Sequence, residues 1–566
     1  MTPQPYKHME ELMRKYALQN AVKFKGRANL GAVVGKVLQE KPELKAEAPK
    51  IKLQAIKIVE EVNNMSLEDQ EKALSGYKFT EKKKEVKKGL KDLPFADDFK
   101  KVIMRFAPSP SGPLHIGHNY VLSLNYLYAK KYKGKIILRI EDTNPSNIYE
   151  KAYDLIPEDA QWLTNNGIDE VLIQSDRMDI YYGHALKLVE EGHSYVCTCT
   201  PDEFKSLISK KMPCPCRDLS EKENTKRWHK MFDGYKEGEA VVRFKSDYKH
   251  KNPAMRDFPL LRINDNEHPR TGKKYRVWPL MNFSVAMDDM ELSVTHAVRG
   301  KDHADNAKRQ EMIHHIFKHR TPVAISVGRI NFTGGFPVSA TKTKEKIDSG
   351  EFDGWDDIRI PFLGALRRRG YQAGALRKYA EEVGISKADK TVTMEEFFKT
   401  MNSFNKDLLE KKANRYFFVK DPIEITIENA PELEIELDLH PELRKRGRHF
   451  HTNDKFFITK QDFDNLKDKK IYRLMDCLNF RKEGEKFVFV STDLEDYKKS
   501  GESIMHWLPS NDTIKVSVVM QDNKTIEGVG EKLLNDLKQG DIIQFERFAF
   551  CKLDNSDEMK FWYTHK

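Results

Sequence analysis

The pattern of hydrophobic positions divides the chain into three parts. In the first part, apolar residues recur at the i, i+4, i+7 and i+11 spacing of one helix face, at Ile51, Ala55, Ile58 and Val62. The sequence Ser-Leu-Glu-Asp at 66–69 resembles a capping box that opens the next helix. We therefore expect residues 1–98 to be helical, and nothing in them points to chemistry.

The second part opens with short apolar runs that alternate with loops. A largely apolar run at 102–107 is followed by a loop rich in Pro, Ser and Gly at 108–113. A helical stretch at 119–132 then precedes a second apolar run at 135–140. This order of strand, loop, helix and strand predicts a βαβ unit, and therefore a Rossmann-like parallel sheet that binds a nucleotide.

The third part, beyond residue 410, has short strand-like runs interrupted by turn residues. Apolar and polar residues alternate at 423–427, and the run at 487–490 is apolar. Such short, closely spaced strands predict β-barrels. The total length of 566 residues corresponds to about three to five domains.

Composition narrows the class of protein. The chain has 97 Lys and Arg against 87 Asp and Glu, and the net charge of +10 favours polyanionic partners such as nucleic acids. No apolar run approaches the ~20 residues that a membrane span needs. Residues 1–30 lack the apolar core of a signal peptide. We expect a cytoplasmic multidomain protein without a membrane segment.

Four of the six cysteines lie close together in the sequence. Two Cys-x-Cys pairs, Cys197 with Cys199 and Cys214 with Cys216, supply four thiolates for one tetrahedral ion. Because four protein ligands would fill the site, the pattern predicts structural Zn²⁺. The alternative is a set of reduced structural thiols.

The sequence at 105–118, Arg-Phe-Ala-Pro-Ser-Pro-Ser-Gly-Pro-Leu-His-Ile-Gly-His, is the most informative stretch. His115 and His118 share one face at the start of the predicted helix, where free backbone N–H groups and the helix dipole attract phosphate. Two imidazoles there can donate hydrogen bonds to a phosphoryl group in its transition state. Gly117 leaves room for a nucleotide base beside the backbone.

This stretch resembles the HIGH motif of class I aminoacyl-tRNA synthetases, in the version found in glutamyl-tRNA synthetases. Further matches occur in order at 138–144, 294–303, 354–357 and 367–370. The resemblance covers about residue 30 to the end and is strongest to archaeal members. It implies a multidomain α/β plus β architecture: an N-terminal helical region (1–98), two halves of a class I Rossmann-like catalytic domain (99–197 and 276–345), an acceptor-end-binding insertion between them (198–275), a helical connecting domain (346–412) and anticodon-binding β-barrels (413–566).

The resemblance also implies a site for ATP. Its residues would be Pro108, His115, Gly117, His118 and Lys342. The lysine lies in the sequence Val-Ser-Ala-Thr-Lys-Thr-Lys at 338–344, which is a degenerate form of the Lys-Met-Ser-Lys-Ser loop of the family. Its charge would follow the phosphate oxygens as pyrophosphate leaves. Mg²⁺ is expected from the chemistry of ATP, although no motif marks its ligands.

Recognition of glutamate needs cations for a carboxylate and an anion for the α-amino group. Arg105 and Arg299 are the candidate carboxylate ligands, because guanidinium binds carboxylate in a bidentate manner. Glu141 is the candidate for the ammonium group, and Ser109 would donate a hydrogen bond to the substrate. Bacterial relatives have Tyr and Asn where this chain has Met281 and Val285, and we assign those two residues no role.

The predicted function is that of a monomeric glutamate–tRNA ligase, which activates L-glutamate with ATP and transfers it to tRNA(Glu). The sequence leaves open whether tRNA(Gln) is charged as well. Basic residues at 444–449 and 367–369 are candidate contacts for tRNA phosphates, unless they are ordinary solvated surfaces. Two alternatives stay open: a glutaminyl-tRNA synthetase and a non-catalytic tRNA-binding paralogue. The Ala-Pro-Ser-Pro sequence at 107–110 argues against the first, and the two histidines with Lys342 argue against the second.

Overall fold

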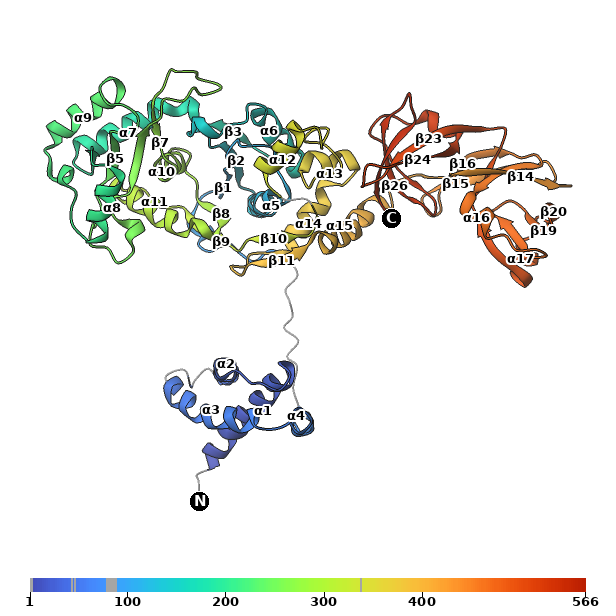
Figure 1. Ribbon diagram of the computed structural model, residues 1–566, viewed down its shortest axis with the longest axis horizontal. Helices are drawn as coiled ribbons and strands as arrows, with labels where there is room; N and C mark the ends of the chain where they lie inside the picture. Colours follow the sequence, from blue (N-terminus) through green and yellow to red (C-terminus); the bar gives the residue numbers. More distant parts are fainter. Residues whose placement is uncertain (1–3, 42–43, 45–46, 78–88, 336–337) are drawn as a thin grey trace. The chain divides into compact units, whose positions relative to one another are not determined.

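The computed structural model describes residues 4–41, 44, 47–77, 89–335 and 338–566 (Figure 1). The chain divides into two compact units, Met1–Lys87 and Lys88–Lys566. This division falls earlier than the boundary predicted at residue 98. None of the helices in the described residues combines the length and hydropathy that crossing a bilayer requires.

The described residues of the first unit form helices α1 (Gln4–Lys23), α2 (Leu30–Glu40), α3 (Ala48–Asn63) and α4 (Leu67–Ser75). The predicted apolar face of α3 is buried in a cluster with Met13 of α1 and Val33 of α2. Ser66 caps α4, because its side-chain oxygen accepts a hydrogen bond from the backbone N–H of Asp69 at 3.1 Å. Both helical predictions for this part are confirmed.

A parallel sheet in the order β3-β2-β1-β8-β9 lies at the centre of the second unit. Its strands are β1 (Ile103–Phe106), β2 (Lys135–Ile140), β3 (Glu170–Ile173), β8 (His296–Gly300) and β9 (Val323–Val327). Helix α5 (Ile116–Lys131) connects β1 to β2, which confirms the predicted βαβ unit. Because β1 pairs with β8, strands from both halves of the domain end at one carboxyl edge.

Between β3 and β8 the chain forms an antiparallel sheet in the order β4-β5-β6-β7. Its strands are β4 (Ser194–Cys197), β5 (Val241–Phe244), β6 (Pro259–Ile263) and β7 (Val277–Pro279). The helices of this segment are α7 (Met178–Glu190), α8 (Pro201–Ser209), α9 (Glu221–Asp233) and α10 (Met281–Glu291), whereas α6 (Ala152–Thr164) lies between β2 and β3. The sheet extends on both sides beyond the predicted insertion at 198–275.

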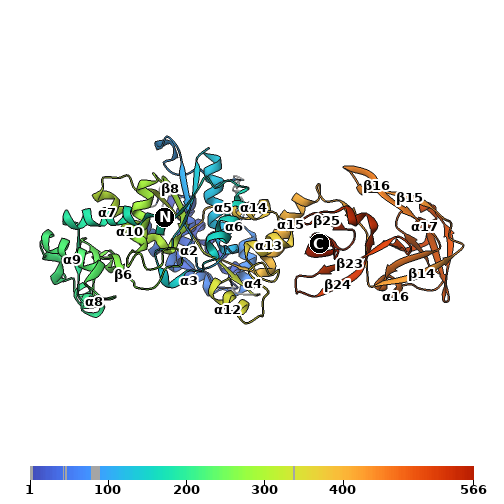
Figure 2. The same ribbon diagram turned by 90° about the horizontal axis from the view of Figure 1, so that it is seen from above.

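Among the described residues, five helices come after β8 in the chain and lead to the C-terminal sheets, the first of them between β8 and β9. They are α11 (Ala304–Ile316), α12 (Ala340–Asp348), α13 (Leu363–Arg369), α14 (Ala373–Val383) and α15 (Met394–Leu409), together with the strand pair β10 (Ile330–Thr333) and β11 (Lys390–Thr393). Within the second unit, α8 and α9 lie at one end and β14 and β15 at the other, with the parallel sheet between them (Figure 1, Figure 2).

The C-terminal part forms two mainly antiparallel seven-stranded sheets and the hairpin β15–β16. The strands are β12 (Arg415–Tyr416), β13 (Phe418–Lys420), β14 (Pro422–Glu428), β15 (Glu434–His440), β16 (Arg444–His451), β17 (Lys455–Thr459), β18 (Ile471–Leu474), β19 (Asn479–Glu483), β20 (Lys486–Ser491), β21 (Gly501–Met505), β22 (Leu508–Pro509), β23 (Thr513–Val519), β24 (Thr525–Glu531), β25 (Ile542–Phe545), β26 (Ala549–Asn555) and β27 (Lys560–His565). Two short helices, α16 (Lys460–Asp464) and α17 (Leu494–Ser500), connect them.

Each of these seven-stranded sheets closes on itself. In the order β12-β25-β26-β27-β23-β24-β13, the two edge strands are separated in the chain only by Phe417. In the order β21-β18-β19-β20-β14-β17-β22, they are separated only by His506 and Trp507. Edge strands that are neighbours in the chain force the sheet to curve into a barrel, so the predicted β-barrels are confirmed.

Candidate active site

The carboxyl edge of the parallel sheet brings three predicted residues together. Arg105 lies in β1, Glu141 follows β2 directly and Arg299 lies in β8. They line a cavity of about 350 Å³ together with Phe106, Ala107, Pro108, Ser109, Gly117, His118, Val121, Met281, Val285, Val298, Gly300, His303 and Gln310. His115 and Lys342 are not among the residues that line this cavity. The sequence therefore predicted residues that line this cavity. They lie together because the carboxyl ends of parallel strands meet at one edge of the sheet.

The two histidines begin helix α5. His115 is its N-cap, and its Nδ1 accepts a hydrogen bond from the backbone N–H of Gly117 at 3.0 Å. The backbone N–H of His115 in turn donates to Nδ1 of His118 at 3.3 Å. Because both Nδ1 atoms accept, the ring proton of each imidazole lies on Nε2.

Both imidazoles are neutral at physiological pH. Burial, together with the neighbouring His118, lowers the pKa of His115 well below 6.5. Burial lowers the pKa of His118 to about 4. His118 therefore offers an Nε2–H donor to a ligand in the cavity without adding positive charge.

The absence of a side chain at Gly117 has a structural cause besides the predicted room for a nucleotide base. A Cβ atom at this position would lie 2.8 Å from Cε1 of His115, so a larger residue would displace the capping ring. Gly117 therefore permits the His115 cap, and its predicted contact with a nucleotide base stays a prediction.

Arg105 and Glu141 belong to a buried ion network that the sequence did not reveal. Nε of Arg105 donates to Asp289 at 3.3 Å, and Nη1 of the fully buried Arg139 donates to the same oxygen at 2.7 Å. Nη2 of Arg139 also bonds Glu141 at 3.0 Å. Burial acts to raise the pKa of Asp289, but Arg105 and Arg139 outweigh it and hold that pKa below its usual value.

Arg299 has a different environment. Its Nη1 donates to Oε1 of Gln310 at 3.0 Å, and no carboxylate of the described residues forms an ion pair with it. Burial and the nearby Arg105 lower the pKa of Arg299 to about 10. The cavity thus contains a cation that forms no ion pair with a carboxylate of the described residues, although Asp289 and Glu141 act on it at longer range. An anionic ligand in the cavity would supply such a pair.

Lys342 lies on a helix, so the expectation of a loop at 338–344 is wrong. Helix α12 begins at Ala340, Ser339 is its N-cap, and Lys342 is exposed. The start of α12 contacts the loop before α5, since a Cβ atom on Gly112 would lie 2.8 Å from that of Ala340. The predicted lysine is therefore near the first motif but outside the cavity.

The four clustered cysteines meet at the end of β4. Their sulfur atoms all lie within 4.8 Å of one another, with Cys197 and Cys199 at 3.5 and 3.4 Å from Cys214. Four sulfurs at 2.3 Å from one tetrahedral Zn²⁺ would be about 3.8 Å apart. The backbone N–H of Thr198 donates to Sγ of Cys216 at 3.5 Å, as is typical of a thiolate ligand. The donor set fits zinc.

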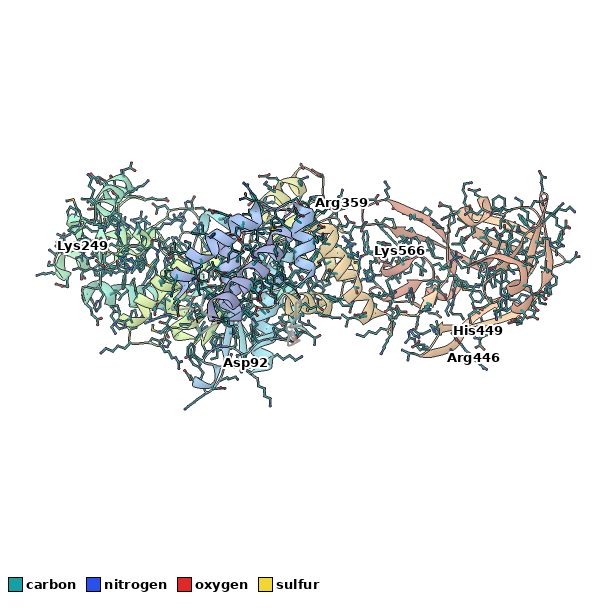
Figure 3. All side chains as sticks on the ribbon, turned by 90° about the horizontal axis from the view of Figure 1, so that it is seen from below. Asp92, Lys249, Arg359, Arg446, His449 and Lys566 are labelled. Atoms are coloured by element: carbon teal, nitrogen blue, oxygen red, sulfur yellow. The ribbon has the colours of Figure 1, made fainter. Side chains whose placement is uncertain are left out.

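The predicted basic patch at 444–449 is only partly exposed to solvent. Arg448 is buried and pairs with Glu531 at 2.6 Å and Glu546 at 2.7 Å. Arg446 and His449, by contrast, are exposed on the β15–β16 hairpin (Figure 3). The patch at 367–369 is likewise reduced, because Arg369 is buried.

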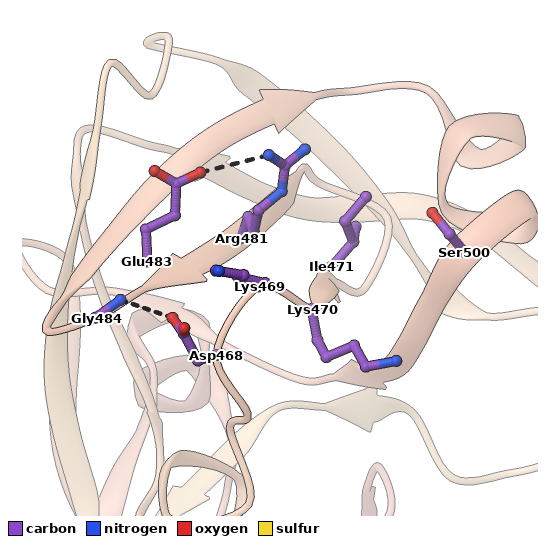
Figure 4. Close-up of a pocket in the computed structure, with 8 residues that line it drawn as sticks. All are labelled: Asp468, Lys469, Lys470, Ile471, Arg481, Glu483, Gly484 and Ser500. Carbon is purple, nitrogen blue, oxygen red and sulfur yellow. Dashed lines mark hydrogen bonds and ion pairs between the residues drawn. The ribbon is translucent and has the colours of Figure 1, made fainter.

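A larger cavity, of about 630 Å³, lies in the barrel that contains β18, β19 and β21 (Figure 4). It is lined by Asp468, Lys469, Lys470, Ile471, Arg481, Glu483, Gly484 and Ser500. Three of these residues are cations and two are carboxylates, and Arg481 pairs with Glu483 at 3.4 Å. The lining is thus polar, with a small excess of positive charge.

Comparisons with known proteins cover the whole chain. A family model described as tRNA synthetases class I (E and Q), catalytic domain, matches residues 101–411, and two models of anti-codon binding domains of the same group match 413–491 and 504–554. A glutamate–tRNA ligase of Methanothermobacter marburgensis is 42% identical over 565 residues, which cover 99% of this chain and 100% of that protein. One of Pyrococcus furiosus is 43% identical over 580 residues, with the same coverage. A solved glutamate tRNA ligase from Elizabethkingia meningosepticum is 20% identical, with a TM-score of 0.41 over 56% of this chain and 71% of that chain.

Proposed function

This chain belongs to the class I aminoacyl-tRNA synthetases of the glutamate and glutamine group, and from that membership we propose that it is a glutamate–tRNA ligase whose reaction takes place in the carboxyl-edge cavity. In this reaction the α-carboxylate of glutamate attacks the α-phosphate of ATP, and pyrophosphate leaves. The 3′-terminal ribose hydroxyl of tRNA then attacks the carbonyl of the adenylate, and AMP leaves. We propose that this activity is cytoplasmic.

The observation that carries this proposal is the charge of Arg299, which meets only a neutral amide inside the cavity. An anionic side chain such as that of glutamate would offset this charge, whereas the amide of glutamine would not. Glu141, held by Arg139, would bind the α-ammonium group. Arg105 and Ser109 would complete the amino-acid site.

The same cavity offers the groups that phosphoryl transfer needs. Nε2–H of His118 would donate to phosphate oxygens as charge shifts toward the leaving pyrophosphate. His115 would fix the start of α5, Gly117 and Pro108 would contact the nucleotide, and Lys342 would approach the phosphates from α12. Mg²⁺ bound to ATP would neutralise phosphate charge.

We further propose that Cys197, Cys199, Cys214 and Cys216 hold one structural Zn²⁺. The ion would cross-link the end of β4 to the loop that follows α8, and would supply no catalytic group because all four positions are protein ligands. We also propose that tRNA binds the barrels, where Lys469 and Lys470 at the cavity of Figure 4 and the exposed Arg446 can contact phosphates.

The test is charging of archaeal tRNA with labelled glutamate and, separately, glutamine, in the presence of ATP. We expect charging with glutamate. Charging with glutamine alone would identify a glutaminyl-tRNA synthetase, and binding of tRNA without charging would identify a non-catalytic paralogue. Repeating the assay with purified tRNA(Glu) and tRNA(Gln) measures whether the enzyme discriminates between them.

A further inference from the structure

The two arginines of the cavity are held by partners of different charge. Arg105 contacts the carboxylate of Asp289, whereas Arg299 contacts the amide of Gln310. Gln310 lies on α11, the helix that follows β8, and its side chain is part of a buried residue with 3% exposure. A neutral residue therefore holds the arginine of this pair that has no ion-pair partner among the described residues.

The orientation of the Gln310 amide follows from chemistry. A guanidinium group can only donate hydrogen bonds, so the atom at 3.0 Å from Nη1 of Arg299 must be the carbonyl oxygen Oε1. Nε2 then points away from Arg299, and it has no hydrogen-bond partner within the described residues. The bond to Arg299 is thus the interaction that orients this side chain.

Gln310 also stands between two cavities. A second cavity of about 310 Å³ shares Arg105, Arg299 and Gln310 with the first, and is lined in addition by Asp289, Glu311 and His314. Arg299 could turn toward carboxylates on that side if nothing held it. Arg299 borders both cavities, and its bond to Gln310 limits this rotation.

We propose that Gln310 is a positioning residue that sets the preference for an anionic amino-acid side chain, because it orients Arg299 without neutralising it. This inference rests on the proposed function. A glutamate at position 310 would place a carboxylate within bonding distance of Arg299, and the charge-assisted pair would satisfy the guanidinium before the substrate arrives. A methionine would fill the same space without accepting a hydrogen bond.

The test compares Gln310→Glu and Gln310→Met with the wild type in charging assays. Both variants should raise KM for glutamate, by about tenfold to a hundredfold, which is the loss expected for a hydrogen bond to a charged group. KM for ATP should stay within about twofold, because Gln310 contacts Arg299 and the proposal gives it no contact with a phosphate. Glutamine, used as a competitive inhibitor, should bind Gln310→Glu as well as it binds the wild type.

The ratio of the glutamate and glutamine affinities is the deciding measurement, since a merely structural defect would weaken both ligands and ATP alike. An unchanged ratio in Gln310→Glu, or an equal rise of all the constants, would overturn the inference. If Gln310→Glu does not fold, Gln310→Met decides: an unchanged KM for glutamate overturns the proposal. Failure of the wild type to charge tRNA with glutamate would instead reject the proposed function. Gln70→Met, a buried glutamine in the N-terminal unit, is the matched control.

Discussion

The imidazole rings of His115 and His118 are stacked, with their centroids 3.8 Å apart and their planes inclined by 25°. Two protonated rings at this distance would repel each other, and burial already disfavours the charged form of each. The backbone hydrogen bonds to Nδ1 fix which nitrogen carries the proton. The start of α5 is therefore built to present neutral N–H donors at a fixed position.

Replacing His118 by alanine should reduce the rate of glutamate activation by ~10²–10³, the usual cost of removing one donor to a transition state. The variant removes the Nε2–H group that faces the cavity and the acceptor for the backbone N–H of His115. Pyrophosphate exchange in the presence of tRNA measures the step. His118→Gln keeps a side-chain N–H donor and should recover part of the rate; activity of His118→Ala at the wild-type level would rule out this role.

The neutral histidines also predict how activation depends on pH. Since the pKa of His118 is about 4, its protonation state does not change between pH 6 and 8. We expect the activation rate at saturating substrates to lack a histidine titration in this range. The same pKa also makes the free energy of unfolding depend on pH. The unfolded chain takes up the His118 proton near pH 6.5, whereas the folded chain takes it up only near pH 4, so the folded state loses stability as pH falls from about 6.5 toward 4. A histidine paired with a carboxylate would show the opposite dependence. A rate that halves near pH 6.5 would contradict the first expectation.

The sequence predicted the residues of the cavity but not the residues that hold them. Arg105, Glu141 and Arg299 could be placed at one edge because each ends or follows a strand of a parallel sheet. Asp289 could not, since it reaches Arg105 across 184 residues of sequence and lies on a helix whose contacts no local pattern reveals. The same limit applies to Gln310.

Local patterns also misjudged exposure. The run of cations at 444–449 appears uniform in sequence, yet Arg448 is buried because Glu531 lies opposite it, 83 residues later in the chain. Lys342 was assigned to a loop by resemblance, although the stretch from Ala340 to Asp348 folds as a helix. Both errors arise where tertiary contacts or local helix formation override the motif.

Asp159 predicts a second pH effect, on stability. This buried carboxyl group on α6 accepts a hydrogen bond from the backbone N–H of Leu114 at 3.2 Å, directly before His115. Burial raises its pKa to about 7, against the smaller opposing effects of Arg367 and of the Leu114 N–H. The folded state thus binds this proton more tightly than the unfolded state, and stability falls as pH rises from about 4 to 7.

Asp159→Asn should therefore stabilise the protein at pH 8, by up to ~4 kcal/mol, and the gain should vanish near pH 4. The asparagine oxygen can still accept from Leu114. Thermal unfolding at several pH values measures the difference. Asp154→Asn, an exposed position on the same helix, is the control and should show no such dependence. A constant difference between Asp159→Asn and wild type at all pH values would refute the assignment.

The cysteine cluster predicts a metal content. We expect the full chain, purified without chelators, to contain about one Zn²⁺, because four thiolates complete one tetrahedral site. Cys214→Ser should lose most of this zinc and lower the unfolding temperature, since Cys214 contacts both Cys197 and Cys199. Elemental analysis and thermal unfolding measure the two effects. Cys551→Ala, a buried cysteine outside the cluster, should keep the zinc; a wild type free of zinc after growth in zinc-containing medium would exclude the site.

Arg446 predicts a salt-dependent contact with tRNA. Its side chain is 80% exposed, and among the described residues its ion pair is the 3.5 Å contact with Glu436, so it is accessible to a phosphate. Arg446→Ala should raise KM for tRNA several-fold with kcat unchanged, and should reduce the slope of log affinity against log salt by about one.

Two further variants separate this effect from others. Arg448→Ala, which breaks a buried ion pair two residues away, should instead destabilise the barrel by ~3–5 kcal/mol. Arg320→Ala, an exposed cation paired with Asp98, controls for the loss of net charge. Equal salt slopes for Arg446→Ala and Arg320→Ala would show that the hairpin does not contact the tRNA backbone. Loss of a phosphate contact lowers the slope, whereas loss of one positive charge elsewhere on the surface should leave it nearly unchanged.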